Sequence, residues 1–136
     1  MASVESFENL EIWEQARAIT NKVYDLSETG RFSRDFGLRD QMRRAALSVM
    51  SNIAEGFESP TQKSFINYLG HAKASAGELR SQIYVAVDRK YLSEEEFQEL
   101  KQELSQCSRR IVGLIRYLDS KPNSRRVRED GAFYEL

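Results

Sequence analysis

The amino-acid sequence predicts an all-α protein, an antiparallel up-down-up-down four-helix bundle over residues 1–120 followed by a flexible C-terminal tail over residues 121–136. Three observations predict this fold. Apolar residues recur at alternating three- and four-residue steps along four long stretches, as in helices that bury one face. The connections between these stretches are short, so successive helices must be antiparallel neighbours. Only 2 prolines and 7 glycines occur among the 136 residues, which favours helix over sheet.

The first helix is expected from about Asn9 to Glu28. Its apolar residues repeat in the strict four-three steps of a bundle seam. They are Ile12, Ala16, Ile19, Val23 and Leu26. Gly30 supplies a stop, and Ser33 is the expected cap of the next helix.

The second helix, over about residues 37–57, has an apolar face and a separate polar face. Its apolar face consists of Leu38, Met42, Ala45, Ala46, Val49, Ile53 and Phe57. A polar line on a neighbouring arc consists of Gln41, Arg44, Ser48, Asn52 and Glu55. We expect Gly56 to end this helix, Ser59 to cap the third helix and Pro60 to occupy its first position.

The third helix is expected over about residues 60–90, and the fourth from a capping box of Ser93 and Glu96 to about Ser120. The apolar seams are Phe65, Leu69, Ala72, Ala76, Leu79, Ile83 and Ala86 on the third helix, and Phe97, Leu100, Leu104, Cys107, Ile111, Leu114 and Leu118 on the fourth. The third helix also carries a line of small residues, namely Gly70, Ala74, Gly77 and Ser81. Glycine inside a helix costs about 1 kcal/mol relative to alanine, so this line suggests that another backbone comes close.

A second polar line follows the third helix and includes His71, Ser75 and Glu78. When helices two and three fold back on each other, Arg44 comes level with the turn from Ser75 to Glu78. We therefore expect Arg44 to pair with Glu78 and the two lines to form a structural polar seam that fixes helix register. The expected members of the seam are Gln41, Arg44, Ser48, Asn52, Glu55, His71, Ser75 and Glu78. A ligand-binding or partner-binding face is the alternative.

Several of these residues also carry a resemblance to a known family. Gly37-Leu38, Gln41, Arg44-Ala45-Ala46, Ser48 and the run Ser51 to Gly56 resemble the signature of the four-helix bundle proteins encoded in intervening sequences of bacterial 23S ribosomal RNA genes. Phe7, Leu10, Trp13 and Ala16 are similar to the family's opening, and Ser64-Phe65, Tyr68-Leu69, Ser75 and Glu78-Leu79 are similar to its third helix. Ala74 stands where the family pattern has glycine. The resemblance spans about residues 7–118.

The resemblance implies a small cytoplasmic bacterial bundle, and some relatives of this kind assemble as toroidal pentamers. It also implies distant kinship to the accessory variability-determinant protein of diversity-generating retroelements. That protein is a basic pentameric bundle that works with a reverse transcriptase and nucleic acid. A homo-oligomer, pentameric by this kinship, with RNA, DNA or a reverse transcriptase as partner is therefore the expectation. Members of the family itself mostly lack an assigned activity.

The charge distribution only weakly distinguishes a nucleic-acid adaptor from a protein-protein scaffold. Arg39, Arg43, Lys63, Lys73 and Arg80 are the candidate contacts of a nucleic-acid or ribonucleoprotein adaptor, because an oligomer would repeat them around a ring. The formal net charge of -1 and the lack of a recognised nucleic-acid motif argue against this function. The alternative is a protein-protein scaffold with no nucleic-acid role. Leu47, Met50 and Ala54 lie off the main seam and favour a neighbouring subunit.

The residues do not predict an enzyme. A di-metal site in a helical bundle needs two Glu-x-x-His pairs, but His71 is the single histidine and Tyr68 stands where its glutamate would be. Cys107 has no histidine on its seam to activate it. No catalytic residue, metal or cofactor is therefore expected. The lone cysteine and the lack of a signal peptide or membrane span predict a cytoplasmic protein. In the tail, Phe133, Tyr134 and Leu136 are candidate anchors on a partner.

Overall fold

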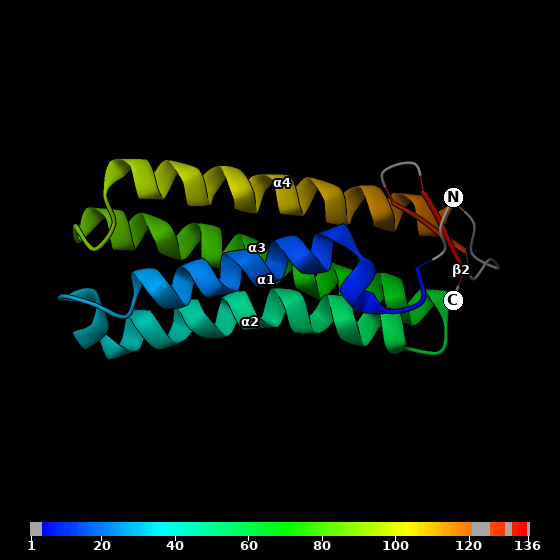
Figure 1. Cartoon of the computed structure of the whole chain (residues 1–136), viewed down its shortest axis with the longest axis horizontal. Helices are drawn as coiled ribbons and strands as arrows, with labels where there is room; N and C mark the ends of the chain where they lie inside the picture. Colours follow the sequence, from blue (N-terminus) through cyan, green and yellow to red (C-terminus); the bar gives the residue numbers. More distant parts are fainter. Residues whose placement is uncertain (1–3, 121–125, 130–131, 136) are drawn as a thin grey trace.

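The computed structural model describes residues 4–120, 126–129 and 132–135. Four long helices lie side by side along the longest axis of the molecule, each antiparallel to the next (Figure 1). Their bounds are α1 Glu11–Leu26, α2 Phe36–Glu58, α3 Gln62–Asp88 and α4 Glu94–Asp119. Short 3-10 turns, η1 Phe7–Asn9 and η2 Phe32–Arg34, precede α1 and α2. Because α1 packs on α2 and α4, and α3 packs on the same two helices, the predicted up-down-up-down bundle is confirmed.

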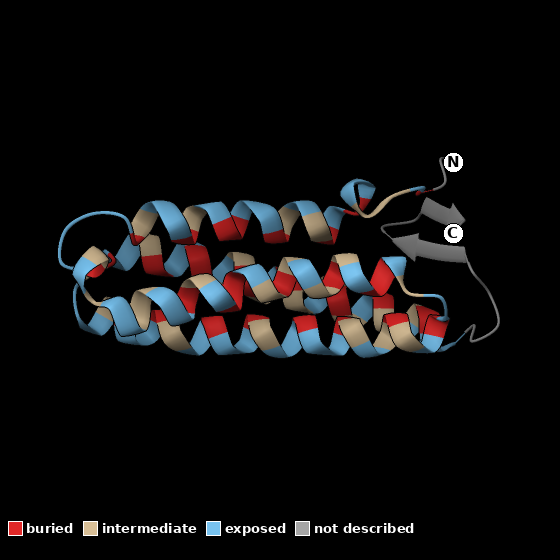
Figure 2. Ribbon diagram, turned by 90° about the horizontal axis from the view of Figure 1, so that it is seen from below, coloured by how far each residue is buried: buried red, intermediate tan, exposed pale blue. Residues whose placement is uncertain are grey.

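The core runs through the middle of the bundle, where the inward faces of the helices are buried (Figure 2). Every residue predicted on the seams of α3 and α4 is buried, including Cys107. On α1 and α2 only the outermost seam residues, Leu26 and Leu38, are half-buried. The three- and four-residue spacing therefore identified the core correctly, because that spacing keeps side chains on one side of a helix.

The helix ends differ from the prediction at two of the caps. Asp35, rather than Ser33, caps α2, with Oδ1 accepting from the Leu38 amide at 3.2 Å. Thr61, rather than Ser59, caps α3 by accepting from the Ser64 amide at 3.1 Å. Both stretches offer competing side-chain oxygen acceptors within two residues, and residue identity alone does not choose between them.

The predicted capping box of α4 is confirmed. The Glu96 amide donates to the Ser93 hydroxyl at 3.0 Å, and the Ser93 amide donates to the Glu96 carboxylate at 2.8 Å. Gly56 does not end α2, because the helix continues to Glu58. A glycine inside a helix costs about 1 kcal/mol relative to alanine. The close packing of α3 against Gly56 explains why glycine is present at this position.

The C-terminal segment contains two short strands, β1 Arg126–Glu129 and β2 Ala132–Glu135. They pair antiparallel, with Val127 opposite Tyr134, and β1 lies against α4. The segment expected as an extended or flexible tail therefore holds two paired strands over these residues, consistent with the strand preference of valine and aromatic residues. Leu136 and residues 121–125 lie outside the described residues. The proposed anchoring of the tail on a partner stays a prediction.

Candidate nucleic-acid interface

The predicted polar seam between α2 and α3 is formed only in its middle. The Ser48 and Ser75 hydroxyls are 2.9 Å apart and share a hydrogen bond across the two helices. The Asn52 amide donates to the Ser48 carbonyl at 2.8 Å and to the Ser48 hydroxyl at 3.0 Å. These three half-buried side chains satisfy one another and tie α2 to α3, which is the structural role expected of them.

The outer members of the seam do not join this network. Gln41, Arg44, Glu55, His71 and Glu78 are all exposed. The expected pair of Arg44 and Glu78 is wrong, because within the described ranges these two side chains form no ion pair with each other. At an exposed position water solvates each charge, and the entropy cost of holding two long side chains together is not repaid.

Arg39 and Arg43, two of the predicted nucleic-acid contacts, are used inside the chain. Arg39 donates to the Ser33 carbonyl at 2.9 Å, pairs with Asp40 at 2.9 Å and lies 4.8 Å from the centre of the Phe36 ring. Arg43 donates to the Ser27 hydroxyl at 2.8 Å, and its guanidinium lies 4.5 Å from the centre of the Tyr24 ring. Both side chains stabilise the α1–α2 connection. Their role therefore differs from that of the other predicted contacts, which lie on α3.

The other predicted contacts lie on α3. Lys63, Lys73 and Arg80 are exposed, and the last two line an open groove of about 520 Å³ between α3 and α4. Arg109 and Arg116 enter the groove from α4. The rest of the lining is small or uncharged, and consists of Gly77, Ser105, Ser108, Val112 and Gly113. The groove therefore combines four cations with no carboxylate in its lining.

These four cations are available to an anion. Lys73, Arg80, Arg109 and Arg116 make no ion pair or hydrogen bond with the parts of the chain that the structure describes. Positive charges gathered around one concave surface raise the local potential even when the net charge of the protein is close to zero. The groove is thus a better candidate for phosphate contacts than the set of residues chosen from the sequence.

Two contacts set the register of α3 against α4. The Gln62 amide donates to the Leu118 carbonyl at 2.9 Å near one end, and the Tyr84 and Phe97 ring centres are 4.8 Å apart near the other. In this antiparallel register the cations fall into pairs with one member from each helix. The pairs are Lys63 with Arg116, Lys73 with Arg109, and Arg80 with Lys101. Successive pairs are seven to ten residues apart, or about 10–15 Å along the axis at 1.5 Å per residue.

The glycines differ sharply between the two sides of α3. A Cβ added to Gly77, Gly70 or Gly113 would meet no atom within 4 Å. A Cβ added to Gly56 on α2 would lie 2.8 Å from the Tyr68 Cβ and 2.9 Å from the Phe65 ring. No described residue therefore makes the close approach expected along the small-residue line of α3. It occurs instead at Gly56, where α2 and α3 cross.

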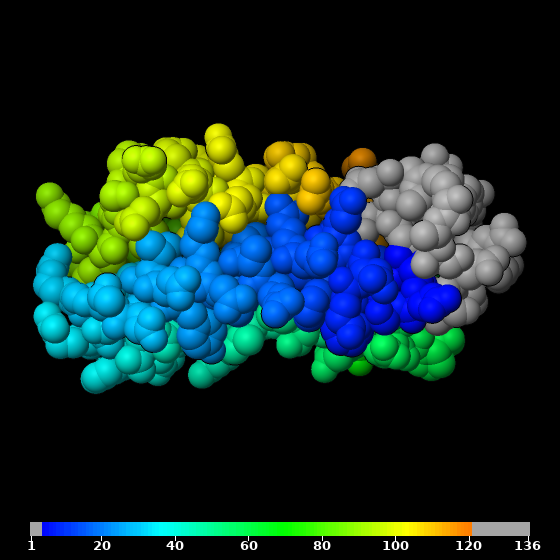
Figure 3. All heavy atoms as spheres, in the orientation of Figure 1, coloured from blue at the N-terminus to red at the C-terminus, as the bar shows by residue number. Residues whose placement is uncertain are grey.

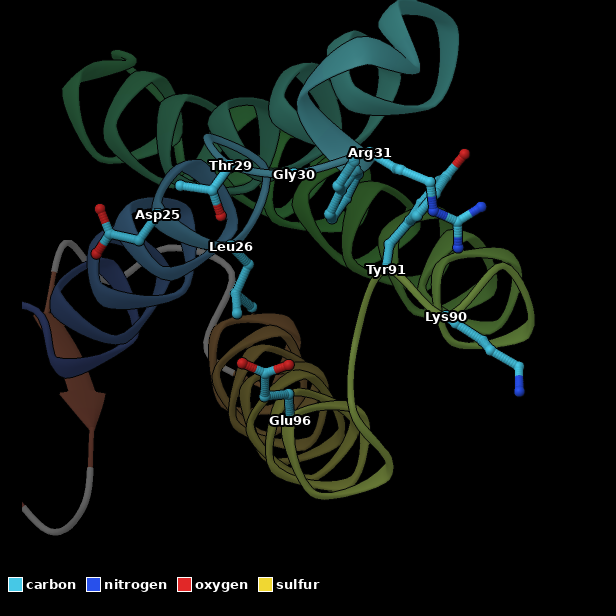
Figure 4. A pocket seen from close by; sticks show the side chains of 9 residues that line it. Asp25, Leu26, Thr29, Gly30, Arg31, Lys90, Tyr91 and Glu96 are labelled. Atoms are coloured by element: carbon cyan, nitrogen blue, oxygen red, sulfur yellow. The ribbon is translucent and has the colours of Figure 1, made fainter.

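A second cavity, of about 410 Å³, lies at the end of the bundle that holds the α1–α2 and α3–α4 connections (Figure 4). Arg31 lies 5.6 Å from the centre of the Tyr91 ring and donates to the Arg89 carbonyl at 3.0 Å. The Tyr91 hydroxyl donates to Asp35 at 3.0 Å, and its ring stacks on Phe32. These contacts fasten the two connections together, and the lining mixes both signs of charge. The cavity is best explained as a structural closure of the bundle.

Polar contacts join α1 to α4. In Figure 3, α1 lies at the front of the molecule between α2 and α4. Lys22 pairs with Glu103, and the Gln15 amide donates to Gln106 at 2.9 Å. The hydrogen bond to Glu103, reinforced by the negative charges of Glu103 and Glu99, raises the pKa of Lys22 against the opposing effect of its partial burial. This side therefore offers no uncommitted cation like those in the groove.

Among the described residues, no group of three or more histidine, cysteine, aspartate or glutamate side chains could hold a metal ion. Within the same ranges, no helix is both long and apolar enough to cross a membrane.

The bundle and its basic groove define a class of small all-helical protein. The family model for the 23S rRNA-intervening sequence protein matches residues 8–113, and the chain belongs to this family. A crystal structure from Bacteroides thetaiotaomicron, described as a protein with unknown function from the S23 ribosomal protein family, has a TM-score of 0.72 to this chain. The match covers 77% of this chain and 95% of that one at 16% identity, and it supports the shared fold. A search of curated proteins finds no match.

Sequence reasoning missed the half of the groove contributed by α4. Lys101, Arg109 and Arg116 repeat at eight- and seven-residue steps, so they share one edge of the helix. That spacing was a usable signal. It gains meaning only once the register with α3 is known, because the cations become pairs across a groove only in three dimensions.

Proposed function

We propose that this protein is a non-enzymatic, homo-oligomeric adaptor of the cytoplasm that binds nucleic acid, with RNA or a ribonucleoprotein as its partner. The single observation that supports this function best is the α3/α4 groove, where four cations have no partner among the described residues and no carboxylate lies in the lining. Phosphate groups are the anions that such a line of lysine and arginine side chains recognises, because each contact releases a condensed counterion.

Oligomerisation would multiply this modest local charge. In a ring of identical subunits the groove would recur, and a pentamer is the size that the family resemblance suggests. Large apolar side chains exposed on α2 and α3 support a subunit contact: Phe36 is 62% exposed, Val85 47% and Leu47 41%. Covering these side chains would remove apolar surface from water.

Binding of labelled RNA and DNA, measured at low and physiological salt on material whose mass is fixed by light scattering, tests the proposal. In the test variant, glutamine replaces Lys73, Arg80, Arg109 and Arg116. In the matched control, glutamine replaces four exposed arginines outside the groove, namely Arg17, Arg34, Arg44 and Arg89. Both variants lose the same amount of charge.

The groove variant should bind at least roughly tenfold more weakly, and the slope of log K against log salt should fall by up to about 3 for a single strand. The control variant should bind like the parent protein apart from a small general effect. Equal losses in the two variants, or no binding by the parent at low salt, would overturn the proposal. Thermal unfolding of both variants verifies that they fold.

A protein-protein scaffold with no nucleic-acid role is the second candidate, favoured by the same exposed Phe36, Leu47 and Val85. It predicts a clean oligomer that binds neither RNA nor DNA at low salt. It also predicts that Leu47→Glu changes the mass measured by light scattering while the groove variant does not. The two candidates therefore separate in one set of measurements.

A further inference from the structure

We infer that the occupant of the α3/α4 groove is a single nucleic-acid strand, with one unpaired base stacked on Tyr84. This inference rests on the proposed function and makes it more specific. Its starting point is that Tyr84 follows Arg80 by four residues, one helical turn further along the edge of α3 that also carries Lys73 and Gly77.

Tyr84 is both held in place and exposed. Its side packs edge-to-face against the buried Phe97, with ring centres 4.8 Å apart and planes at 73°. The residue is nevertheless 45% exposed. A ring fixed by the core with a large part of its surface in water can stack on a base without first being ordered, which lowers the entropy cost of binding.

One cation lies at the Tyr84 ring, and the others follow the groove from it. The Lys101 ammonium lies 5.7 Å from the centre of the Tyr84 ring, and Lys101 is level with Arg80 in the register of the two helices. The aromatic ring therefore stands at one end of the three cation pairs. Proteins that bind single strands combine such a positively charged track for the backbone with an aromatic platform for the bases.

The floor of the groove suits a backbone that comes close. Gly77 and Gly113 have open space where a Cβ would lie, and Ser105 and Ser108 contribute hydroxyl groups to the lining. A duplex would use this surface poorly. Its bases are already stacked and paired, so none can lie on Tyr84 unless it is flipped out and loses its stacking and pairing.

The test compares Tyr84→Ala and Tyr84→Phe with Tyr24→Ala, a matched change at an exposed tyrosine on α1, outside the groove. Each variant is titrated with a labelled unstructured RNA oligonucleotide, with the DNA strand of the same sequence, and with each strand annealed to its complement. RNA and DNA are separate arms because phosphate contacts and stacking serve both. Thermal unfolding is measured for every variant.

Tyr84→Ala should weaken single-strand binding roughly fivefold or more, whereas Tyr84→Phe and Tyr24→Ala should stay within about twofold of the parent. Duplex binding should be weaker and insensitive to all three changes. If the groove-charge variant loses binding but Tyr84→Ala does not, or if duplex binds as well as single strand, the inference is wrong and the proposed function stands. If the groove variant, in which glutamine replaces the four groove cations, binds like its control, both the inference and the proposed function are wrong.

Discussion

The helix α3 meets its two neighbours in different ways. Against α2 it makes a closed contact, in which Gly56 lies under Tyr68 and Phe65, and the Ser48 and Ser75 hydroxyls bond across the interface. Against α4 it leaves an open groove lined by glycine, serine and uncommitted cations. Glycine occurs on both sides, but only at Gly56 does packing within the chain require it.

The two sides of α3 show which features of a bundle contribute to its stability and which are available for binding. A closed contact holds polar groups that satisfy one another, so its residues are explained by folding alone. On the open side the cations have no ion-pair partner and the glycines no close neighbour among the described residues, and natural sequences tend to break local rules at functional sites. The strongest functional hypothesis therefore concerns the side of α3 that packs least.

The largest expected effect comes from filling the closed side. Gly56→Ala places a Cβ within 3 Å of both the Tyr68 Cβ and the Phe65 ring, and neither neighbour is the far end of a flexible chain. The free energy of unfolding should fall by roughly 1–3 kcal/mol from overpacking, partly offset by the better helix propensity of alanine. Urea unfolding measures it, and a variant as stable as the parent would show that α2 and α3 separate easily.

The matched change on the open side should have the opposite sign. Gly77→Ala meets no atom within 4 Å, so only helix propensity changes. Stability should rise by up to about 1 kcal/mol, as expected for glycine to alanine in an exposed helix. The same urea titration measures the change. A loss of stability here, or a changed mass by light scattering, would reveal a close contact with another subunit that the single chain lacks.

Much of this fold could be predicted because the spacing of apolar residues in the sequence directly shows helical periodicity. The seams of α3 and α4 were identified residue by residue, since burial follows the three- and four-residue spacing. Caps were harder, because Ser33 and Asp35, or Ser59 and Thr61, are equally good oxygen acceptors and local backbone geometry chooses between them. Spacing therefore predicts which face is buried more reliably than where a helix begins.

The candidate site could be predicted only in part, for a related reason. Arg39 and Arg43 looked like exposed cations, but the 3-10 turn η2 and the end of α1 bring acceptors to them that no periodicity reveals. Arg109 and Arg116 were missed because their relation to Lys73 and Arg80 depends on interhelical register. Residue type shows which side chains could bind phosphate, and only the packing shows which ones are left to do so.

A third, smaller effect tests the polar part of the closed side. Ser48→Ala removes the hydroxyl that bonds to Ser75 and accepts from Asn52. We expect a loss of roughly 0.5–1.5 kcal/mol in the free energy of unfolding, the usual net worth of an intramolecular hydrogen bond. Arg44→Ala is the comparison from the same polar line, and it should change stability by less than about 0.5 kcal/mol because Arg44 is exposed. Thermal unfolding in which Arg44→Ala costs more than Ser48→Ala would reverse this ranking.

The smallest expected effect lies on the α1/α4 side, where a cation is paired rather than left open. Lys22→Met should lower the free energy of unfolding by roughly 0.2–1 kcal/mol, because the ion pair with Glu103 is partly exposed. Folding raises the pKa of Lys22 above its ordinary value of 10.5, so the pair's contribution is complete below that pH and is lost as the pH rises through the folded value. The difference in Tm between parent and variant should be constant from neutral pH to about pH 9.5 and shrink above about pH 10.5. A difference that persists unchanged above that pH would mean that the charge of Lys22 does not stabilise the bundle.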